Sequence, residues 1–358
     1  MKNIIYVMNV EWNWIKQRPH FIAERLNSKC DIRIVYQYKY GRTNLQKRAN
    51  DNLKLVPLKV IPKITGVEKL RWINDRIIGY KIKRIIGKYR PNAIFLTYPS
   101  QECAISSNYC GDIYYDCMDN HSAFICDKKE KQKMEKQEKK LIEIATKVFV
   151  SSEYLRRTIS ERYQVELDKF VLVRNAYNGN IIDPEIDETN ETDNSLVKLA
   201  YIGTISSWFD FDTILQVLNS KTNVELHLYG PIDKVDIPNN SRIIYHGVIE
   251  HEKLYDTIKH MDCLIMPFVL NEIIEAVDPV KVYEYVNFNK NIIIRKYPEV
   301  ERLKDFVYFY NNSAEFIDAI DRIEQSKNIK YSMKQRTDFL KENSWENRVA
   351  IISKEMGL

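Results

Sequence analysis

The feature that most constrains this chain is a regular alternation of short apolar runs with longer segments of helical periodicity. Such an alternation predicts an α/β fold, in which a parallel sheet is covered by helices on both faces. In the first half we expect strands at Ile4–Met8, Asp31–Tyr36, Ala93–Thr97, Asp112–Tyr115, Val148–Ser151 and Phe170–Val173. The helices expected between them span Arg18–Asn27, Val67–Arg90, Lys128–Ala145 and Glu153–Tyr163.

The alternation stops at residues 183–194 and then restarts. This segment holds six acidic residues and no basic one, which predicts a solvated linker. After it we expect strands at Val197–Ile202, Val224–Tyr229, Arg242–Tyr245, Cys263–Met266, Asn291–Ile294 and Val307–Tyr310. The expected helices span Asp210–Leu218, His251–His260, Pro279–Asn287, Ala314–Gln325, Ser332–Lys341 and Trp345–Met356. The sequence therefore predicts two α/β domains, whose ligands would bind where the carboxyl ends of the strands face a cleft.

The net charge of +5 hides an uneven distribution along the chain. Residues 1–90 hold 21 Lys and Arg against 6 Asp and Glu, a net charge of +15, whereas residues 179–358 have a net charge of −10. Such asymmetry predicts an anionic partner for the first domain: a membrane surface, nucleic acid or a phosphorylated substrate. Segment 66–90 combines basic residues with an apolar stripe, so it can pack on the sheet and still present bases to lipid.

Other classes of protein are disfavoured by composition. No apolar run approaches the roughly 18 residues that span a bilayer, and the N-terminal run predicts a buried strand and no signal peptide. The six cysteines form no C-x-x-C pair, so we expect reduced thiols, a cytoplasmic location and no metal site.

The strongest local signal is the segment Asp278-Pro-Val-Lys-Val-Tyr-Glu-Tyr. Asp278 is predicted to be the N-cap of a helix, with Pro279 at its first position. The free N–H groups of Val280 and Lys281, with the Lys281 ammonium, would then bind an anion such as a diphosphate. Glu284 lies one turn further and could accept hydrogen bonds from sugar hydroxyls. The alternative is an ordinary capped helix with solvated charges.

Other candidates in the second half follow predicted strands. Gly203 and Thr204 follow one strand, and glycine there permits close approach of the backbone to a ligand. Three further strand ends could line a flat pocket for a nucleobase, through Tyr229, Gly230, Val248 and Phe268. Asp210-Phe-Asp212 has the D-x-D pattern of metal-dependent sugar transfer, but Asp210 opens a helix, so we expect it to cap that helix.

In the first half, Trp14 belongs to a polar aromatic loop that leads to Arg18-Pro-His20 at the start of a helix. Arg18 and His20 flank the start of this helix, which we expect to face the predicted cleft. Asp119 and His121 follow another strand and are candidates for contact with a sugar or acceptor, although a single histidine is more often structural.

These segments, in this order, resemble the GT-B glycosyltransferases, in particular the branch of retaining family four that builds teichuronic acid, capsule and S-layer polysaccharides. The matching segments are Trp14 with Arg18-Pro-His20, Tyr115-Asp-Cys-Met-Asp119, Val150-Ser-Ser-Glu-Tyr-Leu155, Val173-Arg-Asn-Ala-Tyr177, Tyr201-Ile-Gly203 with Trp208-Phe-Asp210, Tyr229-Gly-Pro231, Met266-Pro-Phe268, Pro279-Val-Lys-Val-Tyr-Glu-Tyr285 and Ser344-Trp-Glu346. The resemblance covers nearly the whole chain.

The resemblance implies two Rossmann-like domains: an acceptor domain over 1–180, a linker over 181–196, a nucleotide-sugar domain over 197–342, and a last helix over 343–358 that crosses back to the first domain. The donor would be a UDP-, dTDP- or GDP-linked sugar, with Lys281 at its diphosphate and Glu284 at its ribose. The acceptor would be a glycan or a lipid-linked molecule, and the enzyme would work at the inner membrane face, without a metal or a nucleic-acid partner. The catalytic residues would be Lys281, Asp119 and His121, and Trp14, Arg18 and His20 would contact the acceptor.

Two positions depart from the family's pattern. The first Glu of the family's Glu-x7-Glu pair is Ala276 here, so Glu275 or Asp278 would have to replace it. The basic residue that often follows the first Gly turn of the second domain is Thr204. Two alternatives stay open: a nucleotide-sugar epimerase or hydrolase on the same fold, and a basic-faced binding protein without catalytic activity.

Overall fold

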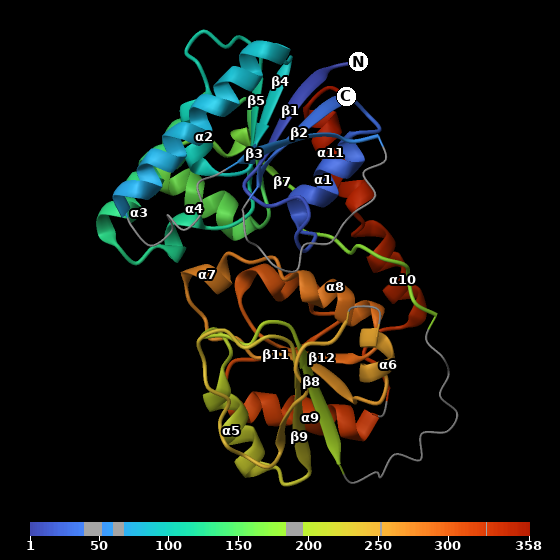
Figure 1. Ribbon diagram of the computed structural model, residues 1–358. Coiled ribbons are helices and arrows are strands. Elements are labelled where there is room, and N and C mark those ends of the chain that lie inside the picture. The colour runs from blue at the N-terminus through green and yellow to red at the C-terminus, as the bar shows by residue number, and fades with distance from the viewer. Residues whose placement is uncertain (39–51, 60–67, 184–195, 251–252, 327) are drawn as a thin grey trace. The chain divides into compact units, whose positions relative to one another are not determined.

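The structure is a computed structural model that describes residues 1–38, 52–59, 68–183, 196–250, 253–326 and 328–358. The chain divides into two compact units (Figure 1). The first comprises Met1–Asn175 with Trp345–Leu358, and the second comprises Ala176–Ser344. Most of the predicted acidic linker lies outside the described residues. No helix in the described part of the chain is both long and apolar enough to cross a membrane.

The first unit is built on a seven-stranded parallel sheet with strand order β3-β2-β1-β4-β5-β6-β7. Its strands are β1 (Asn3–Met8), β2 (Asp31–Tyr38), β3 (Lys54–Lys59), β4 (Ala93–Leu96), β5 (Asp112–Cys117), β6 (Lys147–Val150) and β7 (Phe170–Leu172). Its helices are α1 (Arg18–Leu26), α2 (Glu68–Tyr89), α3 (Lys128–Ile144), α4 (Glu153–Tyr163) and α11 (Trp345–Glu355), with 3₁₀ turns at Pro99–Ala104, His121–Phe124 and Leu167–Lys169.

The second unit has a six-stranded parallel sheet with strand order β10-β9-β8-β11-β12-β13. Its strands are β8 (Val197–Ile202), β9 (Val224–Tyr229), β10 (Ile243–Tyr245), β11 (Cys263–Met266), β12 (Asn291–Arg295) and β13 (Tyr308–Tyr310). Its helices are α5 (Phe211–Ser220), α6 (Leu254–Ile258), α7 (Glu272–Glu275), α8 (Val280–Asn287), α9 (Ser313–Ser326) and α10 (Met333–Glu342), with a 3₁₀ turn at Pro298–Leu303. The predicted pair of Rossmann-like parallel-sheet units is confirmed.

The C-terminal helix packs against the beginning of the chain, as predicted. Arg25 of α1 pairs with Glu346 of α11 at 2.7 Å, and the rings of Phe21 and Trp345 stack with centroids 5.2 Å apart. Trp345 is almost fully buried, so this contact is part of the core of the first unit.

One strand escaped prediction. Strand β3 occupies the edge of the first sheet and contains Lys54, Pro57 and Lys59. Charged residues and proline are common on edge strands, where they prevent pairing with other chains, and they remove the apolar signal that identifies central strands. The short helix α7 was also missed, because four residues are too few to show a helical period.

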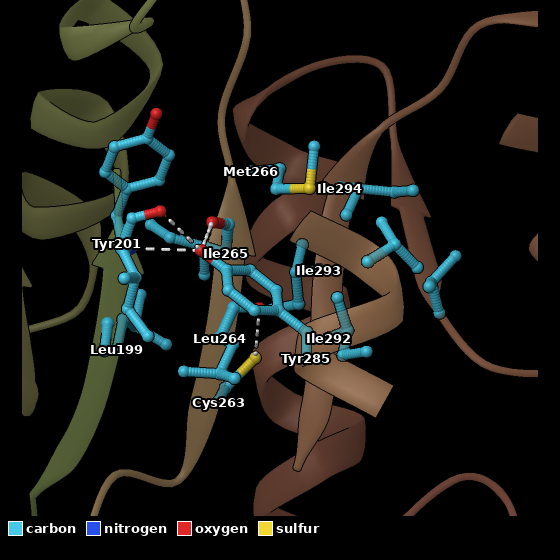
Figure 2. Packing of buried hydrophobic residues seen from close by; sticks show 14 of the residues in the cluster. Leu199, Tyr201, Cys263, Leu264, Ile265, Met266, Tyr285, Ile292, Ile293 and Ile294 are labelled. Carbon is cyan, nitrogen blue, oxygen red and sulfur yellow. Dashed lines mark hydrogen bonds between the residues drawn. The ribbon is translucent and has the colours of Figure 1, made fainter. Parts of the chain in front are cut away.

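The core of the second unit shows how α8 is fixed to the sheet (Figure 2). Strands β8 and β11 pair only at Leu199–Cys263 and Ala200–Leu264, so they separate toward their carboxyl ends. The Tyr285 hydroxyl of α8 lies in this gap and accepts a hydrogen bond from the Ile202 amide at 3.0 Å. The sheet's strand order reverses between β8 and β11, and such a switch point is where open α/β sheets bind ligands.

Candidate functional site

Two glycine turns lie side by side at the carboxyl edge of the second sheet. Gly203 follows β8 and Gly230 follows β9, and both have a φ of +140°, which favours glycine. The Gly203 amide donates to the Tyr229 carbonyl at 2.8 Å. A Cβ on Gly230 would lie 2.2 Å from the Gly203 carbonyl oxygen, so a side chain there would clash with the backbone. The two turns are therefore packed backbone to backbone.

Lys281 lies directly over Gly203. A Cβ added to Gly203 would lie 2.1 Å from Lys281 Cε and 2.7 Å from Lys281 Nζ. The lysine stem therefore occupies the space that any larger residue at position 203 would need. The sequence analysis named both residues as donor-site candidates but did not predict that they contact each other.

The Lys281 ammonium is partly buried beside an aromatic ring. Its Nζ lies 5.8 Å from the centroid of the Tyr201 ring. Burial lowers the pKa of Lys281, and the nearby Glu284 carboxylate partly offsets this. Among the residues that the structure describes, no carboxylate lies within salt-bridge distance of Nζ. A cation that is taken from water without a counter-ion is costly, and a bound anion would relieve that cost.

The start of α8 differs from the prediction by one residue. Pro279, and not Asp278, occupies the N-cap position, and no side chain caps the helix. Asp278 is buried, and its carboxylate accepts hydrogen bonds from Arg302 and from the Tyr283 hydroxyl at 3.1 Å. Asp278 does not cap the helix because its carboxylate forms a salt bridge with Arg302. Arg302 lies 24 positions downstream, so no local sequence pattern indicated this pairing. The Val280 and Lys281 amides are thus left without a capping side chain.

The remaining predicted donor-site residues lie at or after the carboxyl ends of β9, β10 and β11 or at the start of α8, and they differ in exposure. Val248 and Val280 are 71% and 47% exposed, whereas Tyr229 and Phe268 are buried. The Tyr229 ring stacks on His246 with centroids 4.5 Å apart, and Phe268 packs edge-on against Tyr201. These two rings support the loops, and they offer little surface to a ligand.

Thr204 and Glu284 complete the predicted donor-site residues. Both are partly exposed, and the Thr204 carbonyl accepts a hydrogen bond from the Tyr201 hydroxyl at 3.0 Å. Asp210, the first acid of the D-x-D pattern, caps α5 by accepting from the Thr213 amide at 2.9 Å. The expectation that this acid is a helix cap is confirmed.

Ala276 and Glu275 lie at the end of α7, next to the Asp278 turn. Ala276 is buried, whereas Glu275 is partly exposed. Asn271 fixes the start of this short helix by accepting from the Ile273 and Ile274 amides at 3.0 Å. Of the two candidates for replacing the family's first Glu, Glu275 is the more accessible.

In the first unit, Arg18 forms a buried salt bridge. Its Nε lies 3.0 Å from both carboxylate oxygens of Asp116, its NH2 lies 2.7 Å from one of them, and its NH1 donates to the Val173 carbonyl at 2.6 Å. Asp116 is completely buried and Arg18 is 6% exposed. In this structure Asp116 and the Val173 carbonyl bind the Arg18 guanidinium, and the predicted contact of Arg18 with an acceptor stays a prediction.

His20 is also buried. Its Nδ1 accepts from the Gln17 amide at 3.1 Å, so its Nε2 carries the proton and donates toward the carbonyls of Glu11 and Trp12, each at 3.2 Å. The imidazole thus holds the loop after β1 against the start of α1. Trp14, from the same loop, is partly exposed. Of the three predicted acceptor contacts, only Trp14 has surface available.

Asp119 and His121 lie close together in the chain after β5, in a polar corner where burial changes their pKa values. Burial raises the pKa of Asp119 to about 6, while the Arg18 charge lowers it and the Asp116 charge raises it. Burial lowers the pKa of His121 to about 4, and its ring meets the Tyr98 ring edge-on at 5.0 Å. Near neutral pH this corner holds a neutral imidazole beside a carboxyl group that titrates close to the working range.

Sequence reasoning assigned no role to three residues that organise these sites: Asp116, Arg302 and Tyr285. Each acts through a partner distant in sequence. Asp116 meets Arg18, Arg302 meets Asp278, and Tyr285 meets the backbone of β8. A buried acid in a strand, such as Asp116, could have been recognised as needing a cation, because unpaired buried charges are rare.

Comparison with known proteins decides the fold. A solved structure of sucrose-phosphate synthase from Thermosynechococcus elongatus matches with a TM-score of 0.72 and 12% identity, over 100% of this chain and 98% of that chain. The chain has the GT-B fold. HepE of Anabaena, solved in complex with UDP and glucose, matches with a TM-score of 0.63 and 10% identity over 100% of this chain and 98% of that chain.

Sequence comparison adds one distant relative. The chain is 21% identical, over 279 residues, to TuaH of Bacillus subtilis, whose name assigns it to teichuronic acid biosynthesis as a glycosyltransferase. The match covers 71% of this chain and 69% of TuaH. No protein-family model matches the chain. The GT-B fold predicted from the order of the motifs is thus confirmed by structure.

Proposed function

We propose that this protein is a glycosyltransferase that moves a sugar from a nucleotide-diphosphate sugar to a glycan or lipid-linked acceptor in cell-surface polysaccharide synthesis. The observation that carries the proposal is the Lys281 ammonium, held against Gly203 and without a carboxylate partner among the described residues. The GT-B fold and the distant similarity to TuaH agree with it.

In this proposal the donor lies at the carboxyl edge of the second sheet. Its diphosphate contacts the Lys281 ammonium and the uncapped amides at the start of α8. Its ribose contacts Glu284, and the exposed Val248 lies near the base. Charge that develops on the leaving diphosphate is then stabilised by groups already in place, and no metal is needed for that role. Glu275, rather than the buried Asp278, binds hydroxyls of the donor sugar.

The chemistry we propose is transfer with retention of configuration. The acceptor hydroxyl attacks from the side of the leaving group, and a diphosphate oxygen takes its proton while the sugar passes through an oxocarbenium-like state. Trp14 of the first unit contacts the acceptor, and Asp119 and His121 remain candidates for contact with it. Arg18 and His20 act indirectly, by fixing the loop and the helix around them.

The partner of the first unit would be an anionic surface at the cytoplasmic face of the membrane. The support is the net charge of +15 over residues 1–90, set against −10 over residues 179–358. A lipid-linked acceptor would be found at such a surface. The described helices supply no membrane span, so attachment would be peripheral.

Replacing Lys281 with Ala tests the proposal. We expect sugar transfer to fall by about 100-fold or more, because a charge-assisted contact to the diphosphate is lost in a partly dehydrated site. The melting temperature should change little, since the lysine has no ion-pair partner to leave unpaired in the described structure. Lys334→Ala is the matched control, because Lys334 is exposed on α10.

The donor is identified first, with a thermal-shift panel of UDP, GDP, dTDP and their sugars, since a bound ligand raises the melting temperature. Near-wild-type transfer by Lys281→Ala would refute the assignment of the site. Product that forms equally without an acceptor would favour an epimerase or hydrolase. Duplex binding without nucleotide-sugar binding would favour a basic-faced binding protein.

A further inference from the structure

Arg302 binds a carboxylate that lies directly before the start of α8. This carboxylate belongs to Asp278, which precedes the N-cap residue Pro279 and is 1% exposed. Arg302 donates from NH2 to the Asp278 carboxylate and, at 3.0 Å, to the Tyr283 hydroxyl. The Tyr283 hydroxyl donates to the same carboxylate at 3.1 Å. The three side chains therefore form a closed triangle of polar contacts.

The 3₁₀ turn that contributes Arg302 also fixes the backbone beside Asp278. Tyr297 directly precedes this turn, and its hydroxyl donates to the Val277 carbonyl at 3.2 Å. Within the turn, Glu299 is buried, and its carboxylate lies 3.9 Å from Arg302 Nε. The guanidinium thus has two acidic neighbours, and Asp278 is the nearer one. The segment before α8 is held by the turn through both its backbone and its side chain.

The local sequence favours a different place for the Asp278 carboxylate. Aspartate is among the residues that cap helices most effectively, and its side-chain oxygens accept hydrogen bonds from amides two or three positions downstream. From position 278, those amides belong to Val280 and Lys281. They are the same amides that the proposed diphosphate contacts. A carboxylate there would occupy their hydrogen bonds and place a negative charge beside the Lys281 ammonium.

The charge of Asp278 matters even without such a hydrogen bond. Like charges repel more strongly in a partly dehydrated site than in water, so an unpaired carboxylate beside the helix start would oppose a diphosphate. The Asp278 side chain is fully buried, and the Arg302 side chain is 25% exposed. Their pair has no net charge, so the charge offered to a ligand at the start of α8 is that of Lys281.

We propose that Arg302 is a positioning residue for the donor site. Together with Tyr283 it keeps the Asp278 carboxylate from capping α8, and the first amides of the helix stay open to the diphosphate. Arg302 acts through Asp278 and need not touch the donor. The inference rests on the proposed function, because it requires that a diphosphate binds at the start of α8.

The first experiment measures nucleotide binding by variants of the full chain. UDP, GDP and dTDP are each titrated by calorimetry. We expect Arg302→Met to bind the preferred diphosphate about tenfold more weakly, because Asp278 then competes for the same amides. Arg302→Lys should stay within about threefold of the wild-type chain, since an ammonium still pairs with the carboxylate. The control, Arg322→Met on α9, removes the same charge from an exposed ion pair with Asp318, and should change binding by less than about twofold.

The decisive experiment is suppression by a second substitution. Adding Asp278→Ala to Arg302→Met removes the carboxylate that would cap the helix, so binding should recover by at least about fivefold. If Arg302 served only to stabilise the fold, the double variant would bind no better than Arg302→Met, because it loses a further contact of Tyr283. Melting temperatures report whether each variant folds.

Tyr283→Phe keeps the test available if Arg302→Met does not fold. It removes one hydrogen bond to Asp278 and leaves the ring that stacks on Phe339. We expect binding of the preferred diphosphate to weaken by about twofold to threefold, since Arg302 still holds the carboxylate. Asp278→Ala should reverse this smaller loss as well.

Two results would overturn the inference: binding by Arg302→Met as tight as that of the wild-type chain, or no recovery when Asp278→Ala is added. A failure of the proposed function gives a different pattern. The wild-type chain would then bind none of UDP, GDP and dTDP, or Lys281→Ala would bind as tightly as the wild-type chain. Either result would refute the donor site itself, and the role of Arg302 with it.

Discussion

The two units place charged residues at the same edge of similar sheets but use them differently. In the first unit, the charge of Arg18 is bound by Asp116, and both groups are buried. In the second unit, the charge of Lys281 lies over the backbone of Gly203 with no carboxylate partner in the described part of the chain. The fold supplies a counter-ion for Arg18, and we propose that a bound anion supplies one for Lys281.

This difference bears on how a cation in a sequence is interpreted, as a candidate to bind an anionic ligand or as a partner in a salt bridge within the fold. Arg18 and Lys281 both lie in the first turn of a helix, and both looked like anion-binding residues. Only the contacts separate them. A cation in the first helical turn is therefore evidence for a ligand only after a buried carboxylate has been ruled out within its reach.

The largest effect we expect from this comparison is on stability. Asp116→Asn should lower the free energy of unfolding by about 3–5 kcal/mol, because it leaves the Arg18 guanidinium buried without its counter-ion. Lys281→Ala should lower it far less. Urea unfolding, followed by circular dichroism, measures both. The comparison fails if the two variants lose the same stability, since Arg18 would then not depend on Asp116.

The second effect concerns the close contact of Lys281 with Gly203. Gly203→Ala should weaken nucleotide-sugar binding by about tenfold or more, because a methyl group would overlap Lys281 Cε and the residue would be strained at a φ of +140°. The lysine would have to move away from the predicted diphosphate position. Isothermal titration calorimetry, with the donor identified in the thermal-shift panel, measures this affinity.

Gly87→Ala is the matched control for that substitution. Gly87 lies within α2, and a Cβ there would have no heavy atom within 4 Å. Alanine should stabilise the helix by about 0.5–1 kcal/mol, through its higher helix propensity, and leave donor binding unchanged. Unaltered donor affinity in Gly203→Ala would show that the glycine is needed only for the turn.

Most of the fold could be predicted from the sequence. Central strands such as β1 and β11 are buried on both faces, so their residues form continuous apolar runs. Strand β3 was missed for the opposite reason: as an edge strand it contains lysines and a proline. The C-terminal helix was placed through resemblance to the family, since its contact with α1 joins residues about 320 positions apart in sequence.

For the candidate site, sequence reasoning anticipated only the positions that backbone geometry decides. Gly203, Gly230 and Lys281 follow from strand ends and a helix start, which leave local patterns in the sequence. The roles of Arg18 and Asp278 depend on Asp116 and Arg302, which lie 98 and 24 positions away. No local pattern contains such a pairing, so sequence reasoning assigned these buried charges to ligands.

The smallest effect that we expect is on the pH dependence of stability, through Asp119 and His121. It tests whether these two side chains are buried in the first unit. Between about pH 4 and 6 the folded state keeps the Asp119 proton that the unfolded chain has released, so this residue makes stability fall as pH rises. His121 stays neutral when folded down to about pH 4, whereas the unfolded chain binds a proton below about pH 6.5. That residue makes stability rise with pH over nearly the same window.

The contributions of Asp119 and His121 to the slope of stability against pH therefore oppose each other. Removing one residue should reveal the contribution of the other. Relative to the wild-type chain, Asp119→Asn should show stability that rises more steeply from pH 4 to 6, and His121→Gln should show stability that falls more steeply. Urea midpoints at intervals across this range give both slopes. If Asp119→Asn leaves the slope unchanged, its carboxyl group is hydrated in the folded protein. The polar corner of the first unit would then be open to water, and it would resemble the donor edge of the second unit more than the buried pair of Arg18 and Asp116.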